Sequence, residues 1–238
     1  MGYSKDWKMS VSVCMAVKNG EAYLRDQVES ILNQLSSADE LIISDDGSTD
    51  NTLRILHAYQ DKRIKILLPQ LFDSPSLNFQ YTLRHAVNEF IFLADQDDVW
   101  YEHKINTMVA ELQSNDLVVC DCCLVDENLK ELQPSYFRLH HSGAGLIKNL
   151  IKSSFIGCCM GFRRNLLKKA LPFPEHTMHD LWIGLMAQKY FKVAFIPQIL
   201  VNHRIHQRNY STTGMESRNS LNEKLRTRLR LIINLIRY

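Results

Sequence analysis

The stretch Phe90–Trp100, which reads FIFLADQDDVW, decides the fold, because an apolar run stops abruptly at Asp95, Asp97 and Asp98. A strand buried on both faces needs no alternation, so the run predicts a central strand of an α/β sheet. The carboxylates then follow the carboxyl end of that strand, the edge where open α/β sheets bind ligands. Their mutual repulsion would be offset by a divalent cation, and oxygen ligands favour Mg²⁺ or Mn²⁺. Taken alone, the motif fits a solvated acidic turn better, because short motifs often occur by chance.

Strand and helix patterns alternate on both sides of this stretch. Strands are expected at 11–17, 41–43, 64–68, 90–94 and 116–124, and helices at 21–34, 53–59, 77–87 and 101–112. Such alternation is typical of a parallel, doubly wound sheet whose right-handed crossovers put every strand's carboxyl end at one edge. Asp45 and Asp46 end the second strand, so we expect them to meet Asp95 and Asp97 in one cleft.

The order changes after residue 124. We expect an irregular segment at 130–142, a helix at 145–153, a strand at 155–162, a helix that starts around His179-Asp180 and runs to about Tyr190, and strands at 191–196 and 199–202. The two glycines in 155–162 suggest a close backbone approach. The chain therefore divides into an N-terminal extension (1–9), a ligand-binding half (10–125), a second half of the same domain (126–212) and a C-terminal helix (213–238).

Composition narrows the class of protein. The 238 residues carry a formal charge of +2, which is too small to indicate nucleic acid as a partner. Of the six cysteines only Cys120 and Cys123 have C-x-x-C spacing, and no second pair accompanies them, so we expect reduced, buried thiols and no zinc site. With no signal peptide and no spanning segment, the expected location is the cytoplasm.

The C-terminal segment 218–238 has a different character. It is strongly basic, and its apolar residues fall at helical spacing. A basic amphipathic helix suits an anionic membrane surface, which would make the protein peripheral on the cytoplasmic face of the inner membrane. The same apolar stripe could instead pack back on the domain.

Three further groups of residues could carry chemistry. Asp46 could accept from a uracil or thymine imide or from ribose hydroxyls, or it could cap a helix. Asp180, next to His179 at a helix start, could be a general base, although an N-cap is the commoner role. His206 could complete a metal's ligand set and Arg208 could bind phosphate, but two histidines are more often surface residues. Trp182 is expected in the core or in a cleft wall.

Taken together and in order, these residues resemble the inverting family 2 glycosyltransferases of the GT-A fold. The segments that carry the resemblance are VSVCMAVKNGEAYL, IISDDGSTDNT, FLADQDDVW, MHDLW and NHRIHQRN, which span most of residues 9–209. The DQDDVW and MHDLW forms look most like bacterial rhamnosyltransferase-type enzymes that build O-antigens and other surface polysaccharides. The implied fold is a Rossmann-like, mostly parallel sheet flanked by helices, followed by the amphipathic tail.

The resemblance also implies roles for individual residues. Asp46, together with Ala16 and Asp45, would bind the nucleotide, Asp95 the ribose side, and Asp97 with His206 a Mn²⁺ or Mg²⁺ ion. Asp180 would be the catalytic base, with His179, Trp182 and Arg208 on the acceptor or phosphate side. The family often has Glu-Asp where this chain has His179-Asp180, and Thr, Ser or Pro near Ala16. Asp98 has no predicted role.

The expected function is therefore metal-dependent, inverting transfer of rhamnose or a hexose. The donor would be a dTDP- or UDP-sugar, and the acceptor a lipid-linked oligosaccharide of an O-antigen or capsule. Two alternatives remain at this point. One is a nucleotide-sugar-binding subunit without catalysis, and the other is a metal-dependent phosphohydrolase. The phosphohydrolase would need an Asp nucleophile after the first strand, where this chain has Lys18-Asn19.

Overall fold

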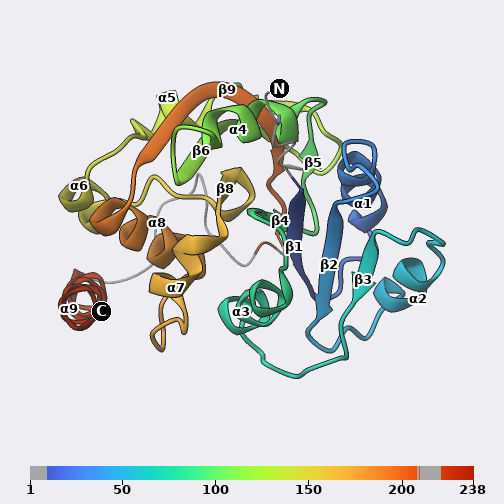
Figure 1. Cartoon of the computed structure of the whole chain (residues 1–238), viewed down its shortest axis with the longest axis horizontal. Helices are drawn as coiled ribbons and strands as arrows, with labels where there is room; N and C mark the ends of the chain where they lie inside the picture. Colours follow the sequence, from blue (N-terminus) through green and yellow to red (C-terminus); the bar gives the residue numbers. More distant parts are fainter. Residues whose placement is uncertain (1–9, 208, 210–220) are drawn as a thin grey trace, which may run out of the picture.

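The computed structural model describes residues 10–207, 209 and 221–238, and within them one large mixed sheet is flanked by helices (Figure 1). The strands are β1 Val11–Val17, β2 Glu40–Asp45, β3 Ile64–Ile66, β4 Phe90–Asp95, β5 Val99–Trp100, β6 Leu117–Val125, β7 Glu131–Gln133, β8 Met160–Arg163 and β9 Val193–Arg204. The α-helices are α1 Leu24–Leu32, α2 Thr52–His57, α3 Pro75–His85, α4 Lys104–Leu112, α5 Tyr136–His140, α6 Leu146–Ile151, α7 Leu167–Ala170, α8 His179–Tyr190 and α9 Leu221–Arg237. Two 3₁₀ turns, η1 Gly157–Cys159 and η2 Arg164–Leu166, flank β8.

The first half of the sheet is parallel, as predicted. The strand order is β3-β2-β1-β4-β8-β6-β9-β5, with β7 beside β6. Cys14 in β1 lies opposite Ile42 in β2 and Leu93 in β4, and all three side chains are buried. The same register places Ala16 opposite Asp95 and Val17 opposite Asp45, so the two acidic clusters leave the sheet at one edge.

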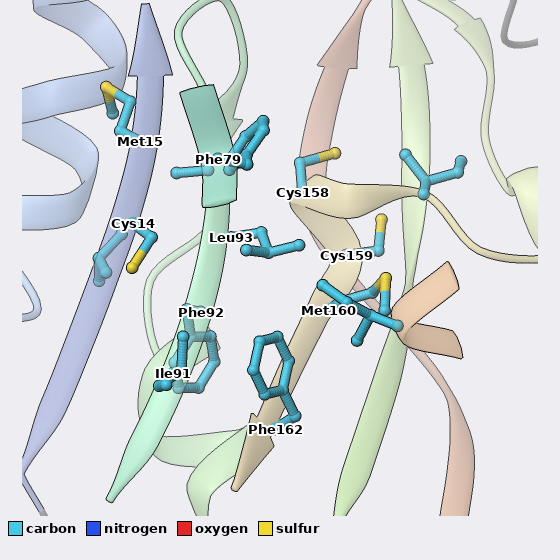
Figure 2. Packing of buried hydrophobic residues seen from close by; sticks show 14 of the residues in the cluster. Cys14, Met15, Phe79, Ile91, Phe92, Leu93, Cys158, Cys159, Met160 and Phe162 are labelled. Carbon is cyan, nitrogen blue, oxygen red and sulfur yellow. The ribbon is translucent and has the colours of Figure 1, made fainter. Parts of the chain in front are cut away.

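The stretch predicted as a strand at 155–162 is only partly one. Residues Gly157–Cys159 form η1, and the strand β8 begins at Met160 and runs antiparallel between β4 and β6. The close approach expected of the glycines is confirmed, because a Cβ on Gly161 would lie 2.9 Å from the ring of Phe92. Figure 2 shows Phe92 and Leu93 of β4 packed between β1 and β8 in the core.

Two other predictions of local structure were wrong. The segment 130–142 is not irregular: it contains β7 and α5, and α5 is held because Phe137 N–H donates to buried Asp121 at 2.9 Å. The predicted strands 191–196 and 199–202 form one strand, β9, whose register against β6 shifts around Asp121. Pro197 lies in that irregular part of β9, where a residue without an N–H can be accommodated.

The helix α9 packs against the rest of the domain by one face. Leu231 and Leu235 are buried, the Lys189 ammonium at the end of α8 donates to the Leu235 carbonyl, and Arg228 donates to the Ile151 carbonyl at 3.0 Å. Figure 1 shows α9 beside α6 and α8, at the end of the molecule away from β3. Among the described residues, no helix combines the length and the apolar character needed to cross a bilayer.

Candidate active site

A cavity of about 560 Å³ opens where β1 and β4 end. Asp46, Asp95 and Asp97 all line it, so the expected meeting is confirmed for these three, whereas Asp45 lies outside the cavity. The rest of the lining comes largely from the second half of the chain. It includes Gly157 of η1, His179 and Asp180 at the start of α8, and His203, His206 and Asn209 after or at the end of β9.

Asp46 is fixed by the loop that follows β3. Its carboxylate accepts from the backbone N–H groups of Phe72, Asp73 and Ser74 at 2.6, 3.0 and 3.3 Å. The Lys18 ammonium lies 3.9 Å from Asp46 and 2.8 Å from Asp73. These contacts hold the loop across one end of the cavity and leave a lysine at its edge.

Asp45, unlike Asp46, is bonded within its own turn. Its carboxylate accepts from the N–H groups of Gly47 and Ser48 at 3.0 and 2.9 Å and from the Ser48 hydroxyl. Gly47 has a φ of +75°, a conformation that glycine adopts without strain. Asp45 does not line the cavity, and these bonds shape the turn beneath it.

Asp95 and Gln96 connect β4 to the loop after β1. Gln96 accepts from the Lys18 N–H at 2.8 Å and donates to the Lys18 carbonyl at 2.9 Å. Burial raises the pKa of Asp95 well above its usual value, and the charges of Asp98 and Asp97 raise it further. A nearby cation would counter that repulsion, so the charge distribution is suited to a bound metal.

Asp97 faces the cavity with two partners from the distant end of the chain. Its Oδ2 lies 2.9 Å from His206 Nε2 and 3.3 Å from the Asn209 side-chain amide. Tyr23 stacks on the His206 ring at 5.0 Å between centroids and orients it. A carboxylate oxygen and an imidazole nitrogen form a donor pair that fits Mn²⁺ or Mg²⁺, so these residues fit the expected metal.

Asp98, which had no predicted role, is fully buried behind this pair. Its Oδ1 accepts from His203 Nδ1 at 2.9 Å and from the Arg204 N–H at 3.0 Å. Burial opposes charge on both side chains, yet Asp98 raises the pKa of His203 and His203 lowers the pKa of Asp98. The ion pair attaches the end of β9 to the acidic turn and so places His206 beside Asp97.

A second group of potential metal ligands lies just beneath the cavity floor. Ligand atoms of Asp98, Cys158 and His203 all lie within 4.8 Å of one another, so these three residues could also hold a cation. Asp98 and Cys158 do not line the cavity, and the short contacts within the group are hydrogen bonds. Asp97 and His206, by contrast, both line the cavity.

Asp180 lies in the first turn of α8 and lines the same cavity as the acidic turn. The Leu181 N–H donates to it at 2.6 Å, and the Gly157 N–H donates as well. Enclosure away from water raises the pKa of Asp180 to about 6 despite these bonds. A carboxylate with that pKa is ionised at neutral pH and basic enough to accept a proton.

His179 beside it is held as a neutral ring. It stacks on Phe79 with 4.1 Å between centroids, and burial lowers its pKa to about 3. In the described part of the chain neither ring nitrogen has a hydrogen-bond partner. His179 therefore packs as a neutral ring beside Asp180, with both of its nitrogens buried.

The remaining three predicted residues lie in different places. Ala16 lines the cavity. Trp182 is buried in the core, where its indole N–H donates to the Ala170 carbonyl at 2.9 Å, and it does not reach the cavity. Arg208 lies outside the described residues.

Sequence reasoning missed several residues of the cavity wall: Lys18, Gln96, Gly157 and Asn209. Asn209 was within reach, because it follows His206 by three positions on the loop after β9. Gly157 had only the signal of a glycine in an apolar run, and its contact with Asp180 depends on the fold.

Comparison with known proteins identifies relatives for most of the chain. Residues 12–171 match the family model described as Glycosyl transferase family 2. An uncharacterised glycosyltransferase of Rickettsia typhi is 28% identical over 221 residues, covering 86% of this chain and 67% of its own length. The Escherichia coli protein WfgD, named as a UDP-Glc:alpha-D-GlcNAc-diphosphoundecaprenol beta-1,3-glucosyltransferase, is 23% identical over 85% of this chain and 79% of its own. The dTDP-rhamnosyl transferase RfbG of Shigella flexneri is 36% identical, over only 43% of this chain and 38% of its own.

The fold has counterparts among solved structures. The Staphylococcus aureus TarS fragment 1–349, crystallised with UDP-GlcNAc, superposes with a TM-score of 0.73 at 20% identity. The match covers 95% of this chain and 67% of the TarS chain, so this chain spans about two thirds of that neighbour's length. The expected GT-A fold is thereby confirmed.

Proposed function

The chain belongs to glycosyltransferase family 2, and we propose that it transfers a sugar from a nucleoside diphosphate donor to an acceptor hydroxyl with inversion. One observation carries the proposal. Asp180, with its pKa raised to about 6, lines the same cavity as the Asp97–His206 pair. Inverting transfer needs both a base and a site for the leaving group in one cavity, because the acceptor attacks from the side opposite the departing diphosphate.

Asp180 is the proposed base. The N–H groups of Gly157 and Leu181 fix its carboxylate at the head of α8. An acceptor hydroxyl within hydrogen-bond distance would pass its proton to Asp180 as its oxygen bonds to the anomeric carbon. Holding the acceptor hydroxyl beside both Asp180 and the anomeric carbon would lower the entropy cost of reaching the transition state.

Asp97 and His206 are the residues that would hold a divalent metal. When bound, such an ion supplies Lewis-acid stabilisation of the charge that develops on a diphosphate leaving group. Asp46 and Asp95, on the β1–β4 side, would face the nucleoside. The positive charge of Lys18 at the cavity edge is complementary to the negative charge of the donor's diphosphate.

The donor we propose is a UDP- or dTDP-sugar carrying a hexose or rhamnose, and the acceptor a lipid-linked oligosaccharide of a surface polysaccharide. Support comes from the relatives' names, which include a UDP-glucose-dependent enzyme acting on a diphosphoundecaprenol and a dTDP-rhamnosyl transferase. TarS, with the same fold, was crystallised with UDP-GlcNAc. Such an acceptor implies work at the cytoplasmic face of the inner membrane.

The test compares Asp180→Asn and Asp97→Asn with Glu111→Gln, an exposed site on α4 that serves as the control. Release of UDP or dTDP from donor sugars is followed with polyprenyl-diphosphate-linked acceptors and Mn²⁺. We expect a loss of about 10² to 10⁴-fold in Asp180→Asn with donor binding retained, because a general base contributes that much. Asp97→Asn should lose its response to Mn²⁺, and Glu111→Gln should match the wild type.

Two results would contradict the proposal. Full turnover in Asp180→Asn would remove this residue as the base. Wild-type protein that binds donor but never releases nucleoside diphosphate would favour a binding subunit, and release of phosphate from free sugar phosphates would favour a phosphohydrolase.

A further inference from the structure

The helix α9 has two apolar rows, one buried and one exposed, and a basic arc next to the exposed row. Leu231 and Leu235 point into the domain and are buried. A second row, which consists of Leu225, Leu229, Ile232, Ile233 and Ile236, is exposed, with 70% of Leu225 and 77% of Ile236 accessible to solvent. At 100° per residue this row spans a continuous arc of the helix, separate from the buried one. Because packing on the domain uses only the first row, the second row is left without a partner within the described residues.

The exposed row continues onto α6. Ile147 and Ile151 lie one turn apart on α6, and they are 74% and 71% exposed. The guanidinium of Arg228, which lies between the buried and exposed rows of α9, donates to the Ile151 carbonyl at 3.0 Å. This bond brings the end of α6 beside the exposed row. We call the resulting surface the α6–α9 face, defined as Ile147 and Ile151 together with the exposed row.

Basic residues border the α6–α9 face on both sides. Arg226, Arg230 and Arg237 are exposed in the arc of α9 next to the apolar row, and Lys148 and Lys152 are exposed on and just after α6. The chain has no Asp or Glu between Glu131 and Glu175 or after Glu223. The border is therefore mainly basic, and Glu223 near the start of α9 is the single acidic residue in the sequence of the two helices.

We propose that the α6–α9 face docks on an anionic lipid bilayer, with its isoleucines and leucines at the level of the acyl boundary and its basic border on the headgroups. An apolar arc flanked by Lys and Arg is the pattern of helices that lie in a membrane interface. The charge also argues against a second copy of this chain, because a two-fold contact would place the same arginine rows against each other.

The α6–α9 face is close to the wall of the cavity that holds Asp180. The chain runs only five residues from Ile151 to Ile156, which lines the cavity. Asp180 begins α8, and Lys189 near the end of the same helix contacts α9. A helix of twelve residues is about 18 Å long, and α9, about 10 Å across, lies between α8 and the bilayer, so docking would bring a bilayer within about 30 Å of the site. Delivery of a lipid-linked acceptor rests on the proposed function, whereas binding to the bilayer does not.

The experiment is vesicle flotation of the full chain, without substrates, so that its outcome is independent of transfer activity. Phosphatidylcholine vesicles are compared with vesicles containing equal parts of phosphatidylglycerol, at 0.05 and 0.5 M salt. We expect binding to the anionic vesicles only, weakened by salt because the headgroup attraction is screened.

Variants test which surface binds. Leu229→Ser/Ile236→Ser on α9 and Ile147→Ser/Ile151→Ser on α6 should each reduce bound protein at least tenfold. Val87→Ser/Leu132→Ser removes exposed apolar side chains elsewhere and should change nothing. Arg226→Glu/Arg230→Glu should abolish binding, and Arg54→Glu/Arg84→Glu, exposed on α2 and α3, should not. Unchanged thermal unfolding identifies variants that remain folded.

Several outcomes would overturn the proposal. The first is no flotation with anionic vesicles, and the second is equal binding to neutral vesicles. The third is a loss of binding in the α9 variant but not in the α6 variant, because α6 would then not belong to the docking surface. A dimer by light scattering that the α6 and α9 substitutions dissociate, without any vesicle binding, would assign the face to a second copy instead.

Discussion

At the scale of single residues, Asp180 determines how the proposed reaction depends on pH. Its pKa of about 6 comes from enclosure, and a base works only in its ionised form. We therefore expect kcat/KM to be constant above pH 7 and to fall tenfold per pH unit below about 6. The measurement is a pH profile at saturating metal, with thermal unfolding at each pH to show that the protein stays folded. A profile that is flat from pH 5 to 7 would rule Asp180 out as the titrating base.

His179 should affect stability in acid. The folded chain holds it neutral with a pKa of about 3, whereas in the unfolded chain its pKa is about 6.5. Below pH 6.5 the unfolded state binds a proton that the folded state does not, so the free energy of unfolding falls as pH falls. This loss amounts to about 2 kcal/mol between pH 7 and pH 5.

The substitution His179→Phe keeps the stacking on Phe79 and removes the titrating group. We expect this variant to lose about 2 kcal/mol less than the wild type between pH 7 and 5. His57→Phe, at an exposed position of α2, is the control and should follow the wild type. Chemical denaturation at the two pH values measures the difference, and parallel losses in wild type and His179→Phe would contradict the explanation.

At this scale the sequence predicted the acidic residues but not their partners. Asp46, Asp95, Asp97 and Asp180 were found because each follows a strand or begins a helix in a recognisable motif. Asp98 received no role, because its partner His203 lies 105 residues away. The Gly157 bond to Asp180 was likewise invisible, since neither residue belongs to a pattern that includes the other.

At the scale of elements, α8 carries a glycine for steric reasons. In the middle of a helix, Gly→Ala usually stabilises by up to about 1 kcal/mol. Here a Cβ on Gly184 would lie 2.3 Å from the ring of Phe155. We expect Gly184→Ala to lower the free energy of unfolding by about 1 to 3 kcal/mol, as overpacking does.

Urea denaturation of Gly184→Ala, Phe155→Leu and the double variant tests this explanation. The leucine opens space for the new methyl group, so the double variant should be more stable than the sum of the single effects predicts. Additive losses would mean that the contact with Phe155 is not the cause.

Elements with local signals were predicted well, and those set by distant pairing were not. The apolar run at residues 90–94 predicted β4, because burial on both faces leaves its mark in the sequence. Residues 155–162 have the same apolar character, yet Gly157–Cys159 form a 3₁₀ turn. Only the antiparallel insertion of Met160–Arg163 between β4 and β6 explains where that strand begins.

At the scale of the whole molecule, the cavity joins the two halves of the chain. Asp46, Asp95 and Asp97 come from the first half, and Asp180 and His206 come from the second. A nucleoside diphosphate bound with a metal would contact both walls, and a ligand that binds only the folded state adds to the free energy of unfolding. The metal matters most, because its proposed ligands Asp97 and His206, one from each half, lie 2.9 Å apart.

We expect UDP or dTDP with Mn²⁺, at about 100 times its Kd, to stabilise the protein by about 2.7 kcal/mol. For a domain of this size that raises the melting temperature by about 5 to 10 °C. Without metal the shift should be much smaller, and GDP should give less than UDP or dTDP if Asp46 pairs with a pyrimidine imide. Asp97→Asn should keep the small metal-free shift and lose the increment from Mn²⁺, while Glu111→Gln should keep both. An equal shift with and without Mn²⁺ would show that nucleotide binding does not use a metal at the Asp97–His206 pair, and it would contradict the metal-binding role proposed for these two residues.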